Sequence, residues 1–276
     1  MDSRVANQPF GIFKTPVDKG DFDLEIKISD IKNELALIDK RYLDDILNKY
    51  RTDTRAGVIK LIQKYDKEKQ KLQEELARTE RMKLFEHKYC KYNYICGIDE
   101  VGRGPLAGPV VACALILPKD CNILYINDSK QLSAKKREEL YDQIMEQAIA
   151  VGVGSVPPAR IDEINILQAT YEAMRQAIAN LSVVPDILLN DAVTIPKITI
   201  KQIPIIKGDA KSISIAAASI VAKVTRDRLM IAYDKIFPQY GFVGNKGYGS
   251  MEHIEVLKKI GPSIIHRRSF IKNFGL

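Results

Sequence analysis

Apolar residues recur at helical spacing through the first third of the chain. From residue 53 onward they stand three, four or seven positions apart, with charged residues between them: Val58, Leu61, Ile62, Tyr65, Leu72 and Leu76. This pattern predicts an amphipathic helix. Thr52, Asp53 and Thr54 are candidate N-cap residues for it, because their side-chain oxygens can accept hydrogen bonds from the free N–H groups of a first turn.

Two shorter helices are predicted before this one. Ser29 and Asp30 are placed to cap a helix over residues 31–38, and a second helix covers residues 43–47. No cluster of catalytic side-chain types occurs in this region, which favours an accessory unit over a catalytic one. We therefore predict an N-terminal helical extension over residues 1–91.

After about residue 94 the sequence changes to short apolar runs that alternate with helical stretches. The predicted strands lie at residues 94–99, 110–117, 148–156, 187–191 and, more weakly marked, 203–206. The predicted helices lie at residues 134–147, 160–181, 212–237 and 251–260. Two strands in succession, followed by alternating helices and strands, favour an α/β domain with a mixed central sheet over residues 92–276.

The composition is that of an ordinary globular protein. Of 276 residues, 46% are hydrophobic and 28% are charged, which excludes disordered, collagenous and disulfide-rich classes. The N-terminus lacks the apolar core of a signal peptide. The most apolar stretch, residues 105–118, is interrupted by Gly and Pro and is too short to span a bilayer. We expect no association with a membrane.

Cysteine usage points to a reducing compartment. The four cysteines form no pair or Cys/His pattern with zinc-ligand spacing: Cys90, Cys96, Cys113 and Cys121. We interpret them as reduced thiols and predict a cytoplasmic protein.

The formal net charge is +7, with 42 Lys and Arg against 35 Asp and Glu. The excess is C-terminal, because residues 207–276 contain 12 basic and 5 acidic residues. The basic side chains around Asp209 and near the C-terminus are Lys207, Lys211, Lys223, Arg226, Arg228, His266, Arg267 and Arg268. Contacts with nucleic-acid phosphates and a solvated helix face both fit these positions.

Four acidic residues stand at the ends of predicted apolar strands or before a long predicted helix. Asp99 and Glu100 end one strand. Asp191 ends another, and Asp209 precedes the helix at 212–237. Open α/β sheets build their sites at such strand ends. Each acid alone could instead be a turn or cap residue, and this alternative is strongest for Asp209.

Four carboxylates at one sheet edge would repel one another unless cations neutralised them. Oxygen ligands without His or Cys favour Mg²⁺ or Mn²⁺. Paired ions of this kind are the usual apparatus of in-line phosphodiester displacement, where one activates water and the other stabilises the leaving oxygen. Asp99 and Glu100 are adjacent and would point to opposite faces of a regular strand, so both can reach an ion only if the strand ends or bends there. The following residues 102–104, Gly-Arg-Gly, favour such a bend.

Two residues flanked by glycines are candidates for contacts with a nucleic acid. Between Gly102 and Gly104, backbone amides can approach a ligand closely and Arg103 can donate to a phosphate. Tyr248 also stands between two glycines, where an exposed ring can stack on a sugar or base. The alternatives are a simple turn for the first and a core tyrosine in a tight turn for the second.

Five ordered motifs resemble those of bacterial ribonuclease HII and together cover roughly residues 92–272. They are GIDEVGRGPLAGPVV at 97–111, NDSKQLSAKKREEL at 127–140, NDAVTIP at 190–196, KGDAKSISIAAASIVAKVTRDRLM at 207–230, and GYGSMEH with GPSIIHRRSF near the end. The resemblance implies a ribonuclease H-like fold and an enzyme that cleaves the RNA strand of RNA–DNA hybrids with Mg²⁺ or Mn²⁺, leaving 3′-hydroxyl and 5′-phosphate ends. It also implies nicking on the 5′ side of single ribonucleotides embedded in duplex DNA, which begins their removal during repair.

The same resemblance implies roles for individual residues. The acids that would bind two divalent ions are Asp99, Glu100, Asp191 and Asp209. The residues that would contact the substrate are Gly102, Arg103, Gly104, Tyr248 and Lys130. Among these, the Gly-Arg-Gly turn would recognise the 2′-hydroxyl, the tyrosine would stack on the deoxyribose after the junction, and the lysine would contact a phosphate.

Three alternatives stay open on the sequence alone. Ribonuclease HIII also carries an N-terminal extension, but that extension contains β-structure and the turn of that family differs from Gly-Arg-Gly. Another two-metal nuclease of the same fold is the second alternative. A non-catalytic hybrid-binding protein is the third, and the complete set of four acids argues against it. The sequence contains no long apolar heptad seam, so we expect a monomer.

Overall fold

The chain forms two compact units, Met1–Leu72 and Gln73–Leu276. The structure, a computed structural model, describes residues 26–38 and 42–274. The first 25 residues of the predicted N-terminal extension, which include the segment that lacks a signal-peptide pattern, lie outside the described residues. Within the described ranges, no helix has both the length and the apolar character needed to cross a membrane.

The described residues of the first unit form three helices: α1 (Ile28–Leu37), α2 (Leu43–Tyr50) and the first part of α3 (Ala56–Met82). Their apolar faces share a core made of Ile31, Leu35, Leu47, Tyr50, Val58 and Ile62. Arg51, at the end of α2, forms a bidentate ion pair with Asp66 of α3 at 3.0 and 2.9 Å. The predicted helices are confirmed, because the helical spacing of apolar residues gives each helix one face to bury.

None of the residues predicted to cap these helices occupies an N-cap position. Ser29 and Asp30 lie within the first turn of α1, and Lys27 occupies its N-cap position without a side-chain hydrogen bond. The cap predicted at residues 29–30 is therefore wrong. Before α3, the carboxylate of Asp53 accepts a hydrogen bond from the backbone N–H of Arg55 at 2.9 Å, which fixes the chain at the start of the helix.

A mixed five-stranded sheet forms the centre of the second unit. Its strands are β1 (Ile95–Val101), β2 (Val110–Ile116), β3 (Ala150–Val156), β4 (Ile187–Asp191) and β5 (Lys201–Ile205), in the order β3-β2-β1-β4-β5. β2 pairs antiparallel with β1 and β3, whereas β4 pairs parallel with β1 and β5. The predicted mixed sheet is confirmed. All four cysteines are free, and Cys96 and Cys113 are buried within β1 and β2.

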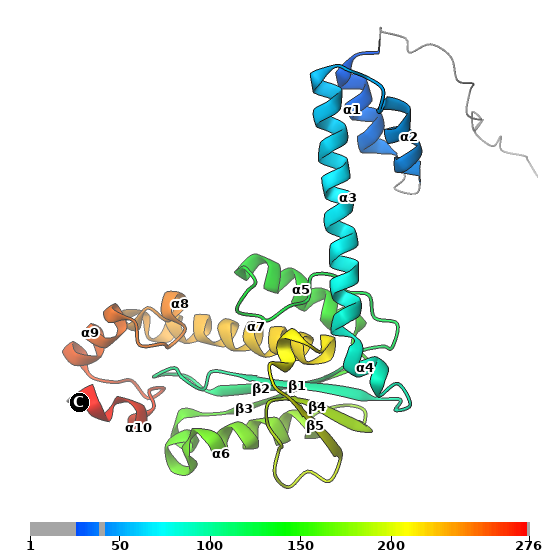
Figure 1. The fold of residues 1–276 in the computed structure, drawn as a ribbon. Coiled ribbons are helices and arrows are strands. Elements are labelled where there is room, and N and C mark those ends of the chain that lie inside the picture. The colour runs from blue at the N-terminus through cyan, green and yellow to red at the C-terminus, as the bar shows by residue number, and fades with distance from the viewer. Residues whose placement is uncertain (1–25, 39–41, 275–276) are drawn as a thin grey trace, which may run out of the picture. The chain divides into compact units, whose positions relative to one another are not determined.

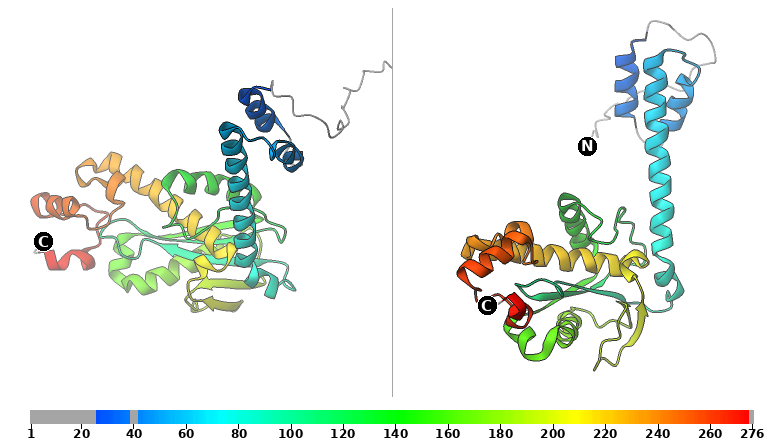
Figure 2. Two further views of the ribbon diagram at one scale, coloured as in Figure 1. Left: turned by 45° about the horizontal axis from the view of Figure 1, so that its top comes forward. Right: turned by 60° about the vertical axis from the view of Figure 1, so that its left-hand side comes forward.

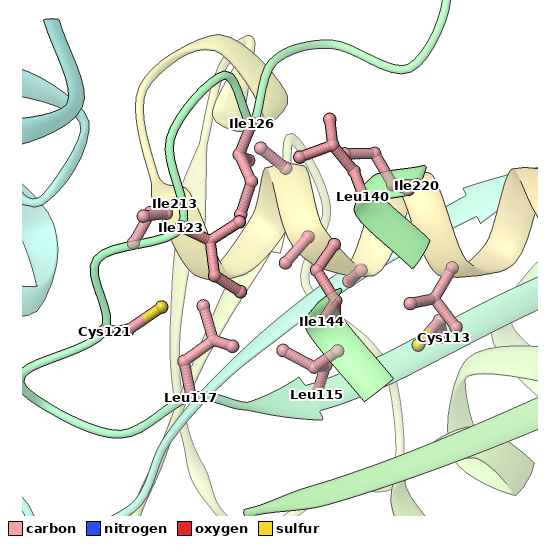
Figure 3. Close-up of a cluster of buried hydrophobic side chains, with 14 of the residues drawn as sticks. Cys113, Leu115, Leu117, Cys121, Ile123, Ile126, Leu140, Ile144, Ile213 and Ile220 are labelled. Atoms are coloured by element: carbon pink, nitrogen blue, oxygen red, sulfur yellow. The ribbon is translucent and has the colours of Figure 1, made fainter. Parts of the chain in front are cut away.

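Helices cover both faces of the sheet, as Figure 1 and Figure 2 show. α6 (Pro158–Ala179) lies on one face, and α5 (Ala134–Gln147) and α7 (Ile213–Ile236) lie on the other. The core under α7 includes Leu115, Leu140, Ile144 and Ile220 (Figure 3). These helices, which follow strands along the chain as the pattern predicted, complete the ribonuclease H-like layer arrangement.

α7 packs closely on β1 at a position where only glycine fits. A Cβ on Gly97 would lie 2.1 Å from the backbone carbonyl carbon of Ser214, in the first turn of α7. This close approach brings the N-terminal part of α7 against the strand that carries Asp99 and Glu100. α4 (Leu84–Lys88), which follows α3, leads directly into that strand.

The helix predicted at residues 160–181 is interrupted at Asn165. This residue has a φ of 66°, and its Oδ1 accepts hydrogen bonds from the backbone N–H groups of Leu167 and Gln168 at 3.0 and 3.1 Å. Asn165 therefore ends one helical piece of α6 and caps the next. The apolar spacing continues across the break, so periodicity alone could not reveal it.

Asn165→Ala is expected to lower the free energy of unfolding by about 1–2 kcal/mol, because alanine loses the cap and disfavours a positive φ. Denaturant unfolding measures this change. Asn165→Gly keeps the backbone freedom and should recover part of the loss. Equal stability of the alanine variant and the wild type would show that the break does not need its asparagine.

Short helices form the C-terminal part: η3 (Pro238–Tyr240), α8 (Phe242–Asn245), α9 (Met251–Ile260), α10 (Arg268–Ile271) and η4 (Lys272–Phe274). Their shared core consists of Leu106, Ala107, Met230, Tyr240, Phe242, Leu257, Ile265 and Ile271. Ser250 caps α9, and Gly261 follows its last turn. The core places the loop before α9 beside the segment that follows β1.

Candidate active site

Asp99 and Glu100 lie where β1 parts from β4. The pairing of β1 with β4 ends at Ile98, whereas β1 continues to pair with β2 as far as Val101. The next residue, Gly102, has a φ of +88°, so the chain turns directly after the strand. From Asp99 onward β1 therefore has no pairing with β4, and the strand ends within three residues. Such a strand end is what allows two adjacent acids to reach one site.

Asp191 and Asp209 reach the same edge from neighbouring segments. Asp191 is the last residue of β4, next to β1 in the sheet. Its Oδ1 accepts a hydrogen bond from the backbone N–H of Gly208 at 2.7 Å. This bond ties the short helix η2 (Gly208–Ala210), and with it Asp209, to the end of β4. Since Ser212 caps α7, capping of the long helix is not the role of Asp209.

The surroundings of these carboxyl groups oppose their ionisation. Asp99 is 6% exposed, and burial, followed by the charge of Glu100, raises its pKa well above the usual value. Burial also raises the pKa of Glu100, although Arg103, whose guanidinium lies 3.1 Å from Glu100 Oε1, acts in the opposite direction. The pKa of Asp209 is raised by burial and then by the charge of Asp191. The acids are thus close enough to repel one another.

The acidic cluster fits a hard cation. Its donors are carboxylate oxygens, which Mg²⁺ and Mn²⁺ prefer. Within the described part of the chain, Glu100 Oε2 is buried without a hydrogen-bond partner, which costs free energy unless a ligand satisfies it. In the same part of the chain, no group of three or more His, Cys, Asp or Glu side chains is placed closely enough to hold a metal ion as it stands. Ion binding would therefore draw the carboxylates together.

The turn at residues 102–104, called the GRG turn below, lies beside Tyr248. An ideal Cβ on Gly104 would be 3.9 Å from Tyr248 Cε1. The two loops are joined by a hydrogen bond from the backbone N–H of Leu106 to the carbonyl of Gly247 at 2.8 Å. Tyr248 is 45% exposed, so the core-tyrosine alternative is wrong and the ring is accessible to a ligand.

Arg267 is fully buried and holds the GRG turn from inside. Its guanidinium donates hydrogen bonds to the backbone carbonyls of Gly102, Arg103 and Gly108. Contact with phosphate and exposure on a helix face, the two roles that the sequence suggested, are both wrong for this residue. A basic residue near the C-terminus was expected at the surface, and the structure uses it as a multiple hydrogen-bond donor to the backbone.

The other basic residues divide into three groups. Arg226 is buried like Arg267, and its guanidinium donates to the carbonyls of Ala107, Pro109 and Lys246. Lys223 and Arg228 form ion pairs with Asp227 and Glu138, respectively. His266 is also buried, whereas Lys207, Lys211 and Arg268 are exposed. Only the last group matches the predicted surface contacts with phosphate.

Two side chains next to the acids were not predicted. The charge of Asp128 contributes, after burial and Asp191, to the raised pKa of Asp209, which Lys130 partly offsets. Ser219, on α7, lowers the pKa of Asp99 in part, and its hydroxyl lies 2.9 Å from that of Ser129. Two features of the sequence could have identified these side chains. Ser219 is a serine inside the apolar run of α7, and Asp128 is an acid close to Lys130.

The fold matches solved structures of the ribonuclease H-like class. The crystal structure of ribonuclease H2 from Pyrococcus horikoshii OT3 matches with a TM-score of 0.55 and 29% identity, covering 66% of this chain and 99% of that chain. A ribonuclease HII chain from Archaeoglobus fulgidus, solved in a complex with PCNA, matches with a TM-score of 0.53 and 27% identity, covering 63% and 93%.

Sequence comparison identifies the family. The family model of ribonuclease HII matches residues 96–273, and that of the ribonuclease HII N-terminal domain matches residues 27–90. Ribonuclease HII of Lachnoclostridium phytofermentans is 68% identical over 250 residues, which cover 91% of this chain and 98% of the relative. That of Clostridioides difficile is 50% identical over 248 residues, covering 89% and 97%. The chain belongs to the ribonuclease HII family.

Family membership establishes an endoribonuclease H, a hydrolase that acts on RNA–DNA hybrids. The resemblance seen in the sequence is therefore confirmed, and a non-catalytic hybrid-binding protein is excluded. A ribonuclease HIII structure matches with a TM-score of 0.51 but at 17% identity, which shows the shared fold alone. The described helices of the N-terminal unit agree with ribonuclease HII rather than with a β-containing extension.

Proposed function

We propose that this enzyme also nicks duplex DNA on the 5′ side of single embedded ribonucleotides, using two divalent ions, Mg²⁺ or Mn²⁺, and leaving 3′-hydroxyl and 5′-phosphate ends. The observation that carries the proposal is the position of Tyr248 beside the GRG turn, which follows the acid-bearing strand: an ideal Cβ on Gly104 would lie 3.9 Å from the tyrosine ring. A turn that can recognise a 2′-hydroxyl and an exposed ring that can stack on the next sugar then recognise one junction together.

The acids supply the ion site. Asp99, Glu100, Asp191 and Asp209 would hold the ions, because their oxygens are hard donors and their mutual repulsion needs a counter-charge. When bound, the ions supply an activated water and a counter-charge for the departing 3′ oxygen. The protein contributes position: the N–H of Gly208 fixes the Asp191 carboxylate, and the end of β1 sets Asp99 and Glu100 beside it.

The substrate contacts come from the GRG turn, Tyr248 and Lys130. The guanidinium of Arg267 donates hydrogen bonds to the backbone carbonyls of Gly102 and Arg103 and so holds the turn in place. The N–H groups of the turn can then donate to the 2′-hydroxyl. This hydroxyl is the group that distinguishes RNA from DNA at one nucleotide. The exposed ring of Tyr248 would stack on the deoxyribose that follows.

Lys130→Ala is expected to weaken hybrid binding severalfold and to lower the slope of log K against log salt concentration by about 1, since one phosphate contact is lost. Fluorescence anisotropy at several salt concentrations, in Ca²⁺ to prevent turnover, measures both. Lys119, which is also exposed but donates to the carbonyl of Cys90, offers Lys119→Ala as a control. An unchanged slope for Lys130→Ala would show that Lys130 makes no contact with a phosphate.

The proposal is tested with three labelled duplexes: one with a single ribonucleotide, one RNA–DNA hybrid and one of DNA alone. In Mg²⁺ or Mn²⁺ we expect a single cut 5′ of the ribonucleotide, several cuts in the hybrid and none in the DNA. EDTA should abolish all cleavage. Cleavage of the hybrid without nicking of the single-ribonucleotide duplex would refute the junction specificity and leave the family activity intact.

We also propose the arrangement of the whole protein. Residues 92–276 would form the catalytic domain and residues 1–91 an accessory extension, and the protein would act as a monomer in the cytoplasm. The absence of a long apolar heptad seam in the sequence supports the monomer. Light scattering of the full chain should give the mass of one copy, and a dimer mass at micromolar concentration would overturn this.

A further inference from the structure

Two histidines lie buried behind the Tyr248 loop. His253, on α9, and His266 are 0% and 2% exposed, and their Nε2 atoms are 2.9 Å apart. His253 Nδ1 lies 2.8 Å from the backbone carbonyl oxygen of Tyr248. His266 Nδ1 lies 3.0 Å from the backbone N of Ser263 and 2.8 Å from its hydroxyl. A continuous chain of polar contacts thus ends on the backbone of Tyr248.

Only one placement of protons satisfies this chain. A carbonyl oxygen only accepts, so His253 Nδ1 must carry the proton that it donates to Tyr248. In a neutral ring His253 Nε2 then accepts, and His266 Nε2–H must be the donor. His266 Nδ1 is left as the acceptor for the N–H and hydroxyl of Ser263. All four ring nitrogens are paired when both histidines are neutral, whereas a further proton would set two N–H groups against each other.

The surroundings of the two rings keep them neutral. The aromatic rings of Tyr240 and Phe242 pack on them, with ring centroids 4.7 Å from His266 and 5.5 Å from His253. Burial lowers the pKa of both histidines, that of His266 to about 4, and the charge of Arg268 acts in the same direction on His266. The proton arrangement is therefore fixed near neutral pH.

The histidine chain and the GRG turn share one anchor. His266 is followed directly by Arg267, whose guanidinium donates to the carbonyls of Gly102 and Arg103. One residue of this pair thus holds the GRG turn, and the other holds Tyr248 through His253. The anchor sets the distance between the two elements that are proposed to recognise a junction.

We propose that His253 and His266 are positioning residues for nicking at single ribonucleotides, because they fix the backbone of Tyr248 relative to the GRG turn through hydrogen bonds with one defined tautomer each. The inference rests on the proposed role of Tyr248. Neither histidine touches the substrate. Cleavage of long hybrids, where ribose follows ribose and many registers can be cut, depends less on this fixed distance.

Two substitutions at one position separate positioning from simple packing. In His253→Asn the amide N–H replaces Nδ1–H, so the bond to the Tyr248 carbonyl is kept and the link to His266 is lost. In His253→Gln the amide lies near Nε2, so the link to His266 is kept and the bond to Tyr248 is lost. We expect the glutamine variant to nick the single-ribonucleotide duplex about tenfold more slowly, the loss of roughly one hydrogen bond. The asparagine variant should stay within about twofold of the wild type by the same measure.

The rate on the long hybrid, measured in parallel, reports the folded and active fraction of each variant. Equal nicking rates for the two variants, relative to that hybrid rate, would overturn the positioning role. If the wild type itself failed to nick the single-ribonucleotide duplex, the proposed function would fail instead, which is a distinct result.

A second measurement needs no variant. The ¹⁵N spectrum of the wild-type histidines near neutral pH is expected to show His253 as the neutral Nδ1–H tautomer and His266 as the neutral Nε2–H tautomer. A charged ring at either position, or the opposite tautomers, would overturn the proposal even if both variants failed to fold.

Discussion

Asp99→Asn is expected to lower the turnover of an RNA–DNA hybrid about a thousandfold or more, equivalent to the loss of roughly 4 kcal/mol of transition-state stabilisation. The substitution keeps the size of the side chain and removes one negative oxygen from the buried end of β1. Steady-state cleavage at saturating Mg²⁺ measures the loss. Turnover within tenfold of the wild type would show that Asp99 is not part of the ion site.

The same substitution should make the metal-free protein more stable at pH 8. Because the folded-state pKa of Asp99 is raised by burial and by Glu100, the stabilising contribution of this group is complete below its unfolded pKa. The contribution is lost as the pH rises through the folded value. At pH 8 the folded wild type therefore bears the free-energy cost of burying this carboxyl group, a cost that asparagine lacks. Thermal unfolding in EDTA should give a higher Tm for the variant, and the difference should shrink at acidic pH.

An exposed aspartate provides the matched control. Asp120 lies on the surface of the same unit, away from the acid-bearing strand ends. Asp120→Asn makes the same chemical change, and we expect it to leave both turnover and Tm unchanged. If Asp120→Asn lowered turnover as Asp99→Asn does, the effect would reflect net charge rather than the site.

Tyr248→Ala is expected to slow nicking of the single-ribonucleotide duplex about 5- to 150-fold, the range that the loss of one stacking contact of roughly 1–3 kcal/mol produces. Cleavage of the long hybrid should fall much less. Since the ring is 45% exposed, its removal creates no large core cavity. Single-turnover assays on the two substrates give the ratio directly.

Tyr248→Phe is the control for this prediction. Phenylalanine keeps the stacking face and removes only the hydroxyl, so its nicking rate should stay close to that of the wild type. An equal loss on both substrates for the alanine variant would mean that Tyr248 supports the loop and does not recognise the junction.

The secondary structure followed largely from the spacing of apolar residues. A helix that buries one face shows the helical period in its sequence, as α3 does. A strand that is buried on both faces appears as a continuous apolar run, as β2 does. The exceptions are local hydrogen bonds. Asn165 breaks α6 with its own side chain, and α1 begins before the residues that could have capped it. Neither event changes the apolar period.

The convergence of the four acids could be predicted because Asp99, Glu100 and Asp191 end apolar strands and Asp209 precedes a long helix. The arrangement behind them could not. Arg226, Arg267 and His266 look like surface residues in a basic segment, yet each is buried. They differ from exposed basic residues because backbone carbonyls and a second imidazole ring surround them and form hydrogen bonds with them. These partners surround them only after β1 and the C-terminal loops have come together.

Ion binding without nucleic acid is the most direct test of the acidic site. Thermal unfolding of the wild type and of Asp99→Asn is followed at pH 8 as Mg²⁺ or Mn²⁺ is added to protein freed of metal by EDTA and dialysis. A ligand that binds only the folded state raises Tm with its concentration. We predict such a rise for the wild type and little or none for the variant. An equal rise in both proteins, or none in either, would contradict a metal site built from these carboxylates.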